Sequence, residues 1–310
     1  MSWHLYSLTF KLRSPLHIGF HKVMHLFRTR AYVPARPFWG ALTAKLTKTL
    51  KSSNCKEVDY KEVGEFLRRT MRFGYLYLSV KNDRIFMPKY TDDGLKFGNL
   101  PQTEFEKRFI SSIASTAIEP NSLTAEEGML HEVEFINPYE IDKENEKLNP
   151  VFLRGLIWIF ESFNGNKSVS INENDFSIKY NRATVKFSEL ASTLQVGGER
   201  KYGFGLIMLE KIEKINNRNL ESIGFNSKWY EHDNKIVIEL NKDDFIWGHL
   251  KYNGKLKIKG NIEPIVGRDW DNRGAGKKLT NYGLCWSPGS VILEPYKFVI
   301  SEDFGLWEIP

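Results

Sequence analysis

The chain has 310 residues, 41% of them hydrophobic and 26% charged, which is the composition of an ordinary globular protein large enough for two domains. Only two cysteines are present, Cys55 and Cys285, so the composition excludes a disulfide framework and a thiolate zinc site and favours a reducing cytoplasm. No run of 18 apolar residues and no signal-peptide pattern occurs, so we expect a cytoplasmic protein that does not associate with a membrane.

The net charge of +6 is unevenly distributed along the chain. Residues 1–56 contain ten lysines and arginines and no acid, so the other 254 residues carry −4. Such a segment predicts contact with a polyanion, and we favour a nucleic acid over a solvated basic face. Phe38 and Trp39 lie close to these cations in the sequence, a pattern that suits stacking on unpaired bases, although Phe38 also starts an apolar helical stripe. The cations assigned to RNA here are Arg13, Lys22, Arg28, Arg30 and Arg36.

The predicted elements begin with a strand at residues 5–12, where apolar and polar residues alternate, followed by an irregular basic loop at 13–36. A helix is predicted from Pro37, a favourable first-turn residue, because apolar residues from Phe38 to Leu50 follow helical spacing. The further predicted elements are a hairpin of 73–80 and 83–88 around residues 81–83, a long insertion at 91–128 with the composition of a mobile loop, strands at 129–136 and 153–160, a helix at 185–194 and a strand at 204–212.

This β-α-β-β-α-β order predicts an α+β protein with a ferredoxin-like (RRM-like) domain, interrupted by insertions, over residues 1–214. Residues 215–310 are predicted to form a second domain that is either smaller and β-rich or again ferredoxin-like. Within it, the glycines of residues 267–278 indicate a second flexible basic loop, which either is solvated or contacts RNA. Its cations are Arg268, Arg273, Lys277 and Lys278.

The stretch VGGERKYGFG, residues 196–205, places four glycines around two cations. It is not a P-loop, because Phe204 stands where the phosphate-binding lysine should follow Gly203, and it is not a dinucleotide fingerprint, because Met208 replaces the third glycine. Either this loop is a tight turn, or its amides and cations bind a phosphate. The residues assigned to RNA by the second interpretation are Gly197, Gly198, Arg200, Lys201, Tyr202, Gly203, Phe204 and Gly205.

Three histidines, His17, His21 and His25, lie in the basic loop with a spacing of four residues. On a helix this spacing would suit a metal, but Pro15 and Gly19 argue against a helix, so we expect no bound metal. A histidine can also exchange a proton near neutral pH, as metal-independent RNA cleavage requires. The alternative is that these histidines touch RNA or a neighbouring subunit, and His17 and His21 are assigned to RNA on that basis.

Several of these segments together resemble the RAMP superfamily of CRISPR-associated RNA-binding proteins. The resemblance covers roughly residues 5–213, and the segments that carry it are SPLHIG, RPFWGALTAKL with Pro37, Gly40 and Ala41, LTAEEGMLHEVEF with Ala125, Gly128 and Leu130, and VGGERKYGFG. Further along the chain, GRDWDNRGAGKK and CWSPGS are similar to the second domain of the subunits that cap the 5′ end of the guide RNA in type III effector complexes.

The resemblance implies a non-catalytic subunit without a cofactor that holds the repeat-derived 5′ handle of the guide RNA. It also implies protein partners, namely the large polymerase-like subunit and the backbone RAMP subunits, with target RNA contacted only indirectly. Backbone members of the family cleave target RNA through an aspartate after the first strand, whereas residues 13–36 contain no acid, so we expect no target cleavage. The alternatives are an endoribonuclease that processes guide precursors through His17, His21 or His25, and a sequence-independent RNA chaperone.

Overall fold

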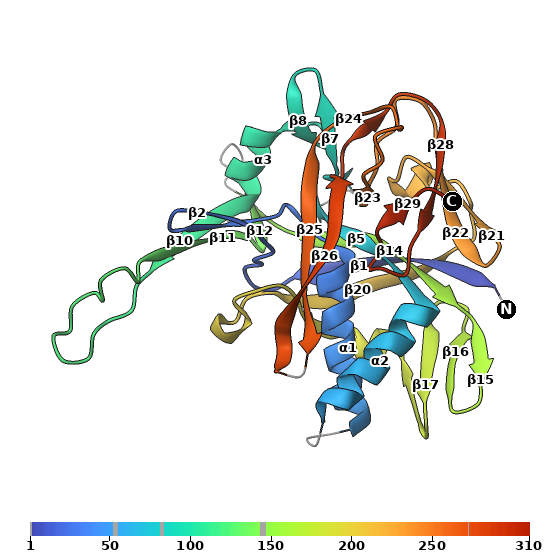
Figure 1. Cartoon of the computed structure of the whole chain (residues 1–310), viewed down its shortest axis with the longest axis horizontal. Helices are drawn as coiled ribbons and strands as arrows, with labels where there is room; N and C mark the ends of the chain where they lie inside the picture. The colour runs from blue at the N-terminus through green and yellow to red at the C-terminus, as the bar shows by residue number, and fades with distance from the viewer. Residues whose placement is uncertain (1, 52–54, 81–83, 143–146, 272) are drawn as a thin grey trace.

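The computed structural model describes residues 2–51, 55–80, 84–142, 147–271 and 273–310 (Figure 1). It confirms a mixed α+β protein that is rich in strands. The main sheet has the order β19-β20-β1-β14-β5-β4, with β6 paired to β5, and all its pairings are antiparallel. Its strands are β1 (Trp3–Leu12), β4 (Tyr32–Val33), β5 (Met71–Val80), β6 (Arg84–Ile85), β14 (Phe152–Phe160), β19 (Thr193–Gln195) and β20 (Leu206–Ile215).

The four long strands of this sheet, β1, β5, β14 and β20, are the ones that the sequence predicts, and most apolar residues of the first three are buried. The predicted hairpin of β5 and β6 is also present, while its turn at 81–83 lies outside the described residues. The first helix, α1 (Ala35–Lys51), buries Phe38, Leu42 and Leu46 and packs against β5. The second, α2 (Glu57–Thr70), was not predicted, although Val63, Phe66 and Leu67 give it a buried face at helical spacing.

The helix predicted at 185–194 is reduced to one turn, α4 (Phe187–Leu190). Phe187 and Leu190 are buried, and the chain then enters β19, where Thr193 pairs with Met208. Before this turn the chain forms a meander of four strands, which are β15 (Ser162–Asn164), β16 (Lys167–Ile171), β17 (Phe176–Tyr180) and β18 (Ala183–Lys186). The prediction was wrong in length because strand pairing at both ends outweighs helical propensity.

The predicted irregular loop at 13–36 instead contains a hairpin of β2 (Gly19–Val23) and β3 (Leu26–Thr29). This hairpin joins β10 (Ile110–Ser115) and β11 (His131–Ile136) in a sheet of order β10-β11-β3-β2. The predicted loop at 91–128 is likewise largely ordered. It contains most of the three-stranded sheet of β7 (Pro88–Thr91), β8 (Gly94–Phe97) and β9 (Leu100–Pro101), then α3 (Gln102–Phe109) and β10. Buried Phe97, Phe105 and Phe109 explain this order, since they form a small aromatic core.

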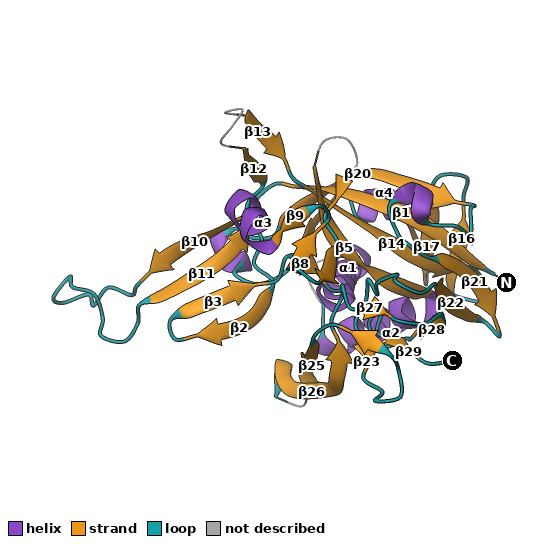
Figure 2. Ribbon diagram, turned by 90° about the horizontal axis from the view of Figure 1, so that it is seen from above, coloured by secondary structure: helices purple, strands orange, loops and turns teal. Residues whose placement is uncertain are grey.

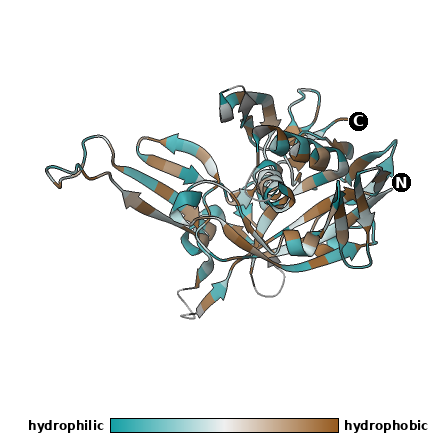
Figure 3. Ribbon diagram, turned by 90° about the horizontal axis from the view of Figure 1, so that it is seen from below, coloured by the Kyte–Doolittle hydropathy of each residue, from teal (hydrophilic) through white to brown (hydrophobic). Residues whose placement is uncertain are grey.

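Residues 110–136 project from the body of the molecule as an extension that we call the finger (Figures 1 and 2). The finger consists of β10, an irregular tip at 116–130 and β11, and it points away from both chain termini. Close to its base lies a short hairpin of β12 (Tyr139–Asp142) and β13 (Lys147–Pro150). In Figure 3 hydrophobic positions fill the centre of the molecule, whereas the finger carries both hydrophilic and hydrophobic stretches.

The C-terminal residues form a second sheet of order β21-β22-β28-β29-β23-β26-β25. The sequence also predicts strands at 235–240 and 255–266; the first is present, and the second is divided into two strands, at 258–259 and from residue 262. Among the described residues after 215, the only helix is the short 3₁₀ helix Glu221–Ile223, which agrees with the β-rich form of the prediction. The strands are β21 (Lys228–His232), β22 (Lys235–Leu240), β23 (Leu250–Lys251), β25 (Ile262–Asp271), β26 (Gly274–Trp286), β28 (Tyr296–Ile300) and β29 (Trp307–Glu308), with β24 (Ile258–Lys259) and β27 (Val291–Ile292) paired separately.

The two large sheets share one hydrophobic core. Trp158 of β14 stacks on Trp247 with ring centroids 6.1 Å apart and planes tilted by 9°, and Trp247 meets Trp307 edge-on at 4.7 Å. All three side chains are fully buried, so the boundary that we predict between residues 214 and 215 is crossed by the core itself. In the described part of the chain, no helix has the length and apolar character of a transmembrane span.

Candidate nucleic-acid interface

A cleft of about 1190 Å³ brings together segments that lie far apart in the sequence. Its walls come from residues 18–21, the first turns of α1, residues 197–200 and the hairpin of β25 and β26, with residues 303–306 closing one side. The cleft therefore unites the basic N-terminal segment, the glycine loop and the C-terminal basic hairpin. The predicted RNA-binding residues that line it are His21, Arg30, Arg36, Trp39, Gly197, Gly198, Arg200 and Arg268.

The glycine loop is fitted closely onto the segment that follows β1. The amide N–H of Gly198 donates to the carbonyl oxygen of His17 (2.8 Å), and that of Gly205 donates to the carbonyl oxygen of Pro15 (2.7 Å). A Cβ atom at Gly197 would lie 2.3 Å from the His17 carbonyl oxygen, and one at Gly205 would lie 1.8 Å from the Val196 carbonyl oxygen. Both residues also have positive φ, so these positions require glycine.

The tip of the glycine loop is exposed to solvent, whereas its base packs closely against other backbone. Arg200 to Tyr202 form one turn of 3₁₀ helix whose three side chains point into solvent, and nothing lies within 4 Å of a Cβ built on Gly203. Arg200 and Lys201 form no ion pair within the described part of the chain, whereas Phe204 packs edge-on against Phe135. The base of the loop is thus a structural turn, and its tip presents two exposed cations, for which phosphate binding stays a prediction.

Three of the arginines predicted to contact RNA are paired with acids from distant parts of the chain. Arg28 pairs with Glu134 (3.2 Å) and Arg30 with Glu263 (2.8 Å), and Arg36 pairs with an acid of β25. The segment without acids therefore receives its counter-charges through the tertiary fold. Each pair neutralises part of the charge that the arginine would offer to a phosphate, and the assignment of these arginines to RNA stays a prediction.

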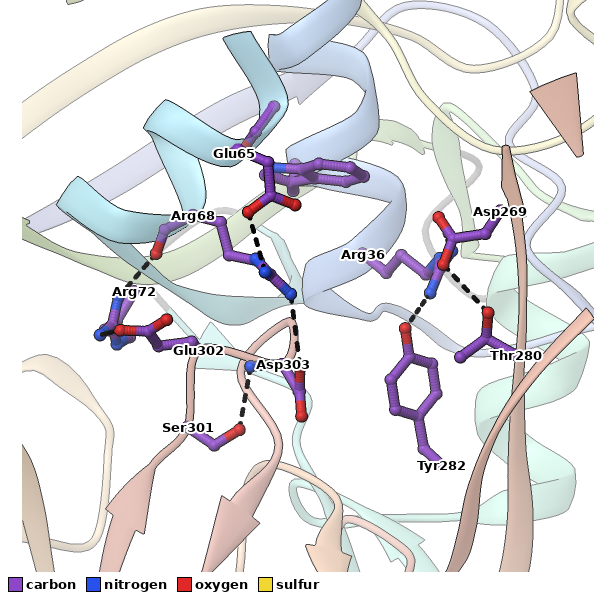
Figure 4. Close-up of polar contacts among 12 residues, drawn as sticks. Arg36, Glu65, Arg68, Arg72, Asp269, Thr280, Tyr282, Ser301, Glu302 and Asp303 are labelled. Carbon is purple, nitrogen blue, oxygen red and sulfur yellow. Dashed lines mark hydrogen bonds and ion pairs between the residues drawn. The ribbon is translucent and has the colours of Figure 1, made fainter. Parts of the chain in front are cut away.

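Arg36 illustrates this pairing (Figure 4). Its guanidinium lies 3.1 Å from Asp269, donates to the carbonyl oxygen of Arg268 (2.7 Å) and to the Tyr282 hydroxyl, and stacks 4.6 Å from the centre of the Phe304 ring. A Cβ at Gly267 would lie only 2.4 Å from this guanidinium, so the hairpin packs directly on it. Arg36 thus fastens the hairpin to the start of α1.

Burial excludes two of the predicted RNA contacts, those of Phe38 and His17. Phe38 is fully buried between Phe10 and Phe73, so it cannot stack on a base, and its other predicted role as a core residue is the one observed. His17 is only 6% exposed, and its Nδ1–H donates to the carbonyl oxygen of Glu134 (2.7 Å). Its ring lies beneath Gly198 and supports the glycine loop, so both the RNA contact and the catalytic role proposed for His17 need correction.

Trp39 is half-buried, because its indole N–H donates to the carbonyl oxygen of Gly64 (3.0 Å) and its ring packs against Phe304, which leaves one edge at the cleft. His21 is exposed at the cleft and its ring lies 3.6 Å from that of Phe20, while His25 is exposed on the turn between β2 and β3. Within the described ranges no three His, Cys, Asp or Glu residues are grouped as a metal site would need. Pro15 and Gly19 do exclude a helix here, as the sequence predicts.

The predicted flexible loop at 267–278 is the end of a long hairpin, in which Arg268 pairs with Leu279 and Asp269 with Lys278 across β25 and β26. Arg268 donates to the carbonyl oxygen of Gly276 (3.3 Å), and Arg273 donates to that of Lys277 (3.0 Å). The predicted residues that do not line the cleft are Arg13, His17, Lys22, Arg28, Phe38, Lys201, Tyr202, Gly203, Phe204, Gly205, Arg273, Lys277 and Lys278.

A buried polar network at the floor of the cleft was missed by the sequence analysis. Glu263 accepts two hydrogen bonds from Arg30 (2.8 and 3.0 Å) and one from His249 Nε2 (2.7 Å), and His249 Nδ1 lies 2.6 Å from the Tyr75 hydroxyl. Burial lowers the pKa of His249, so the neutral ring accepts a hydrogen bond from the Tyr75 hydroxyl at Nδ1. Nothing in the local sequence marks His249 or Glu263, since each stands alone in a strand-like context.

Glu263, the acid of this network, is ionised. Burial alone would raise the pKa of Glu263, but the hydrogen bonds from His249 and Arg30 and the charge of Arg30 outweigh it and lower the pKa to about 2. Glu263 therefore remains a carboxylate at any physiological pH and neutralises Arg30 within the cleft.

The sequence model of the RAMP superfamily matches residues 9–208, and the chain therefore belongs to this superfamily. The family resemblance drawn from the sequence segments is confirmed. No match to the chain is found among curated proteins.

The fold is similar to that of a chain in a cryo-EM structure of the type III-B Cmr-beta complex bound to cognate target RNA and AMPPnP. The TM-score is 0.51 at 11% identity over 92% of this chain and 85% of that chain. A second structure of Cmr-beta with cognate target RNA gives a TM-score of 0.47 at 11% identity, covering 92% and 86%. A CRISPR protein from Archaeoglobus fulgidus gives 0.34 at 10% identity, covering 97% and 96%. The similarity with a TM-score of 0.51 shows only that the two chains share a fold.

Two glycines of the loop should respond differently to alanine. Gly203→Ala should lower the free energy of unfolding by about 1 kcal/mol, because only the positive φ resists it. Gly205→Ala should lower the free energy of unfolding by about 1 to 3 kcal/mol more than Gly203→Ala does, because its Cβ would overlap the Val196 carbonyl. Chemical denaturation measures both values, and equal losses would contradict the described loop geometry.

Glu263 should make stability depend on acid pH. Its pKa rises from about 2 in the folded chain to an ordinary 4.5 on unfolding, so its stabilisation is complete above pH 4.5 and is lost as the pH falls toward 2. A difference of one in pKa corresponds to about 1.4 kcal/mol, so the loss is on the order of 3 kcal/mol. Denaturant unfolding of Glu263→Gln between pH 5 and 2 should show a flatter dependence than wild type, and parallel curves would exclude this network.

Proposed function

We propose that this chain is a non-catalytic RNA-binding subunit of a type III CRISPR effector complex that holds the 5′ handle of the guide RNA. The observation that carries the proposal is the open tip of the glycine loop, where Arg200 and Lys201 form no ion pair within the described residues and lie beside a cleft that aromatic side chains line. Exposed cations bind phosphates, and exposed aromatic rings stack on bases. The exposed Tyr202 offers such a ring at the loop itself.

The ion pairs described above change which cations should bind RNA. Of the cations that the sequence assigns to RNA, those that are exposed and form no ion pair within the described residues are Arg13, Lys22, Arg200, Lys201, Arg268, Lys277 and Lys278. Arg200 and Arg268 line the cleft, and the others belong to the same three regions of the chain, which suits a strand of RNA that crosses this face of the protein. Arg28, Arg30 and Arg36 act instead as positioning residues that fix the walls of the cleft.

The strand order supports the fold that we propose for the N-terminal part. The order β20-β1-β14-β5, with a helical segment after β1 and another before β20, is the arrangement expected of a ferredoxin-like domain. The similar Cmr-beta chain belongs to a structure bound to cognate target RNA. By analogy we propose that this chain joins the large polymerase-like subunit to the backbone subunits and meets target RNA only indirectly.

A second candidate function, guide-precursor cleavage, rests on His21. This histidine is exposed, lines the cleft and stacks on Phe20, so an RNA 2′-hydroxyl can reach its ring. Against it, no carboxylate orients His21 within the described residues, and no second histidine lines the same wall. We therefore rank it below binding.

Removing the two cations of the loop tip should weaken RNA binding without unfolding the protein. The double change Arg200→Ala and Lys201→Ala should reduce guide-RNA affinity by about 1 to 3 kcal/mol, measured by fluorescence anisotropy at a fixed salt concentration. Stability should change by less than about 0.5 kcal/mol because both side chains are exposed.

A matched control is the double change Lys228→Ala and Lys235→Ala, which removes the same charge from exposed positions of β21 and β22 on the far side of the molecule. It should leave guide-RNA affinity close to wild type. If the two double variants bind RNA equally well, the loop tip is not part of the interface.

The purified chain should leave guide-precursor RNA intact both with and without magnesium, as gel analysis would show. Metal-independent cleavage that disappears in His21→Ala or His25→Ala would instead establish the nuclease. His17→Ala is not informative here, because loss of the buried ring disturbs the glycine loop.

A further inference from the structure

The hairpin of β25 and β26, which forms one wall of the cleft, is held at its base by the C-terminal sheet. There Cys285 and Trp286 pair with β23, and Glu263 is fixed by the buried network described above. Beyond this base the hairpin continues as residues 265–271 and 273–283, whose strands pair with each other. We call this distal part the strap, and in Figure 1 it runs beside α1.

Two features form a hinge between the base of the hairpin and the strap. The pairing of β25 with β26 changes register between Pro264 and Val266, so β26 has one extra residue there. Pro264 has no N–H to donate to the ladder, and Gly283 has a φ of 87° with no atom within 4 Å of a Cβ built on it. A bulge that contains an unobstructed glycine and faces a proline bends more easily than a regular ladder.

The strap is fastened to α1 by a weaker contact than the one that holds its base. The ion pair of Arg36 with Asp269 joins side chains that are 19% and 33% exposed, so water screens it and it contributes little stability. The side chains of Arg30 and Glu263 at the base are 13% and 10% exposed, and separating a buried pair costs more. The strap is therefore held firmly at the hinge and loosely at the rim of the cleft.

The closed ion pair blocks one side of the cleft. The strap residues Gly267, Asp269 and Tyr282 line the cleft. Arg36 reaches across from the start of α1 and contacts all three. Because the guanidinium of Arg36 lies only 3.1 Å from the carboxylate of Asp269, no phosphate fits between them. A strand of RNA that enters the cleft from this side has to separate the pair.

We propose that the strap swings open at Pro264 and Gly283 to admit a strand of guide RNA, and that the pair of Arg36 with Asp269 then closes again over the strand. This inference rests on the proposed function, because it needs RNA in the cleft, and it adds how the strand is retained. A closed strap makes dissociation wait for the next opening, which prolongs the lifetime of the complex without further contacts to a base.

Asp269→Asn tests the pair, because it removes the charge and keeps the size of the side chain. The strap should open more often, so labelled guide RNA should dissociate about 2- to 5-fold faster in stopped-flow competition with unlabelled RNA. Loss of an acidic charge near RNA has the opposite effect on its own, because it strengthens the attraction and slows dissociation. The direction of the change therefore separates a strap from simple electrostatics.

Glu65→Gln is the matched control. Glu65 also lines the cleft, and it forms its ion pair with Arg68 of the same helix (2.8 Å). This variant loses the same charge as Asp269→Asn and should release RNA no faster than wild type. If Asp269→Asn also releases RNA no faster than Glu65→Gln, the inference is overturned, while the proposed function stands because RNA still binds.

A crosslink tests the movement of the strap directly. Arg36→Cys with Asp269→Cys, in a Cys55→Ser background, allows a short bismaleimide to fix the strap on α1, and the remaining thiol of Cys285 is buried. Each measurement is compared with the same variant without the linker. Linking before RNA is added should slow association at least about 10-fold, and linking afterwards should slow dissociation by a similar factor.

Two outcomes of the crosslinking experiment contradict different claims. RNA that binds and dissociates at the unlinked rates after both treatments overturns the strap, because the strand then does not pass beneath it. If the wild-type chain binds no guide RNA, the proposed function itself fails, and the strap has no strand to retain.

Discussion

The buried contact of Arg30 with Glu263 is the constraint on which the cleft depends. It fixes a residue from the start of the chain to one that lies 233 positions later, and it does so beside the hairpin that forms one wall. A buried pair adds little stability over an apolar pair, but a single unpaired partner costs several kcal/mol. The contact therefore specifies one closed arrangement of the walls. The ion pair of Arg36 with Asp269 fixes the hairpin in the same way nearer the rim of the cleft.

The central sheet and the first helix could be predicted because their apolar residues follow periods of two and 3.6, which local sequence reveals. The second helix was equally visible in Val63, Phe66 and Leu67 and was overlooked. The finger was masked by its composition, because Pro, Ser, Thr and Gly suggest a loop while strand pairing supplies the order. Apolar periodicity reveals an element that buries one face, and it gives little signal for a projecting hairpin whose residues are mostly exposed.

The segments that the sequence assigns to RNA do converge in the fold, whereas the pairing of their charges could not be predicted. The basic segment, the glycine loop and the C-terminal hairpin do meet at one cleft. Counting charge along the sequence could not tell the paired arginines from the available ones, because Glu134, Glu263 and Asp269 approach only in the folded chain. The glycines, by contrast, were predicted well, since positive φ and close backbone approach are properties of the local chain.

The shared tryptophan core has a consequence for how the protein is made. Trp158 leaves the ribosome before Trp229 and Trp247, whose rings pack against it. During synthesis the main sheet therefore exposes this large apolar ring until the strands of the second sheet follow. We expect a nascent chain that stops before Trp247 to present this ring to chaperones.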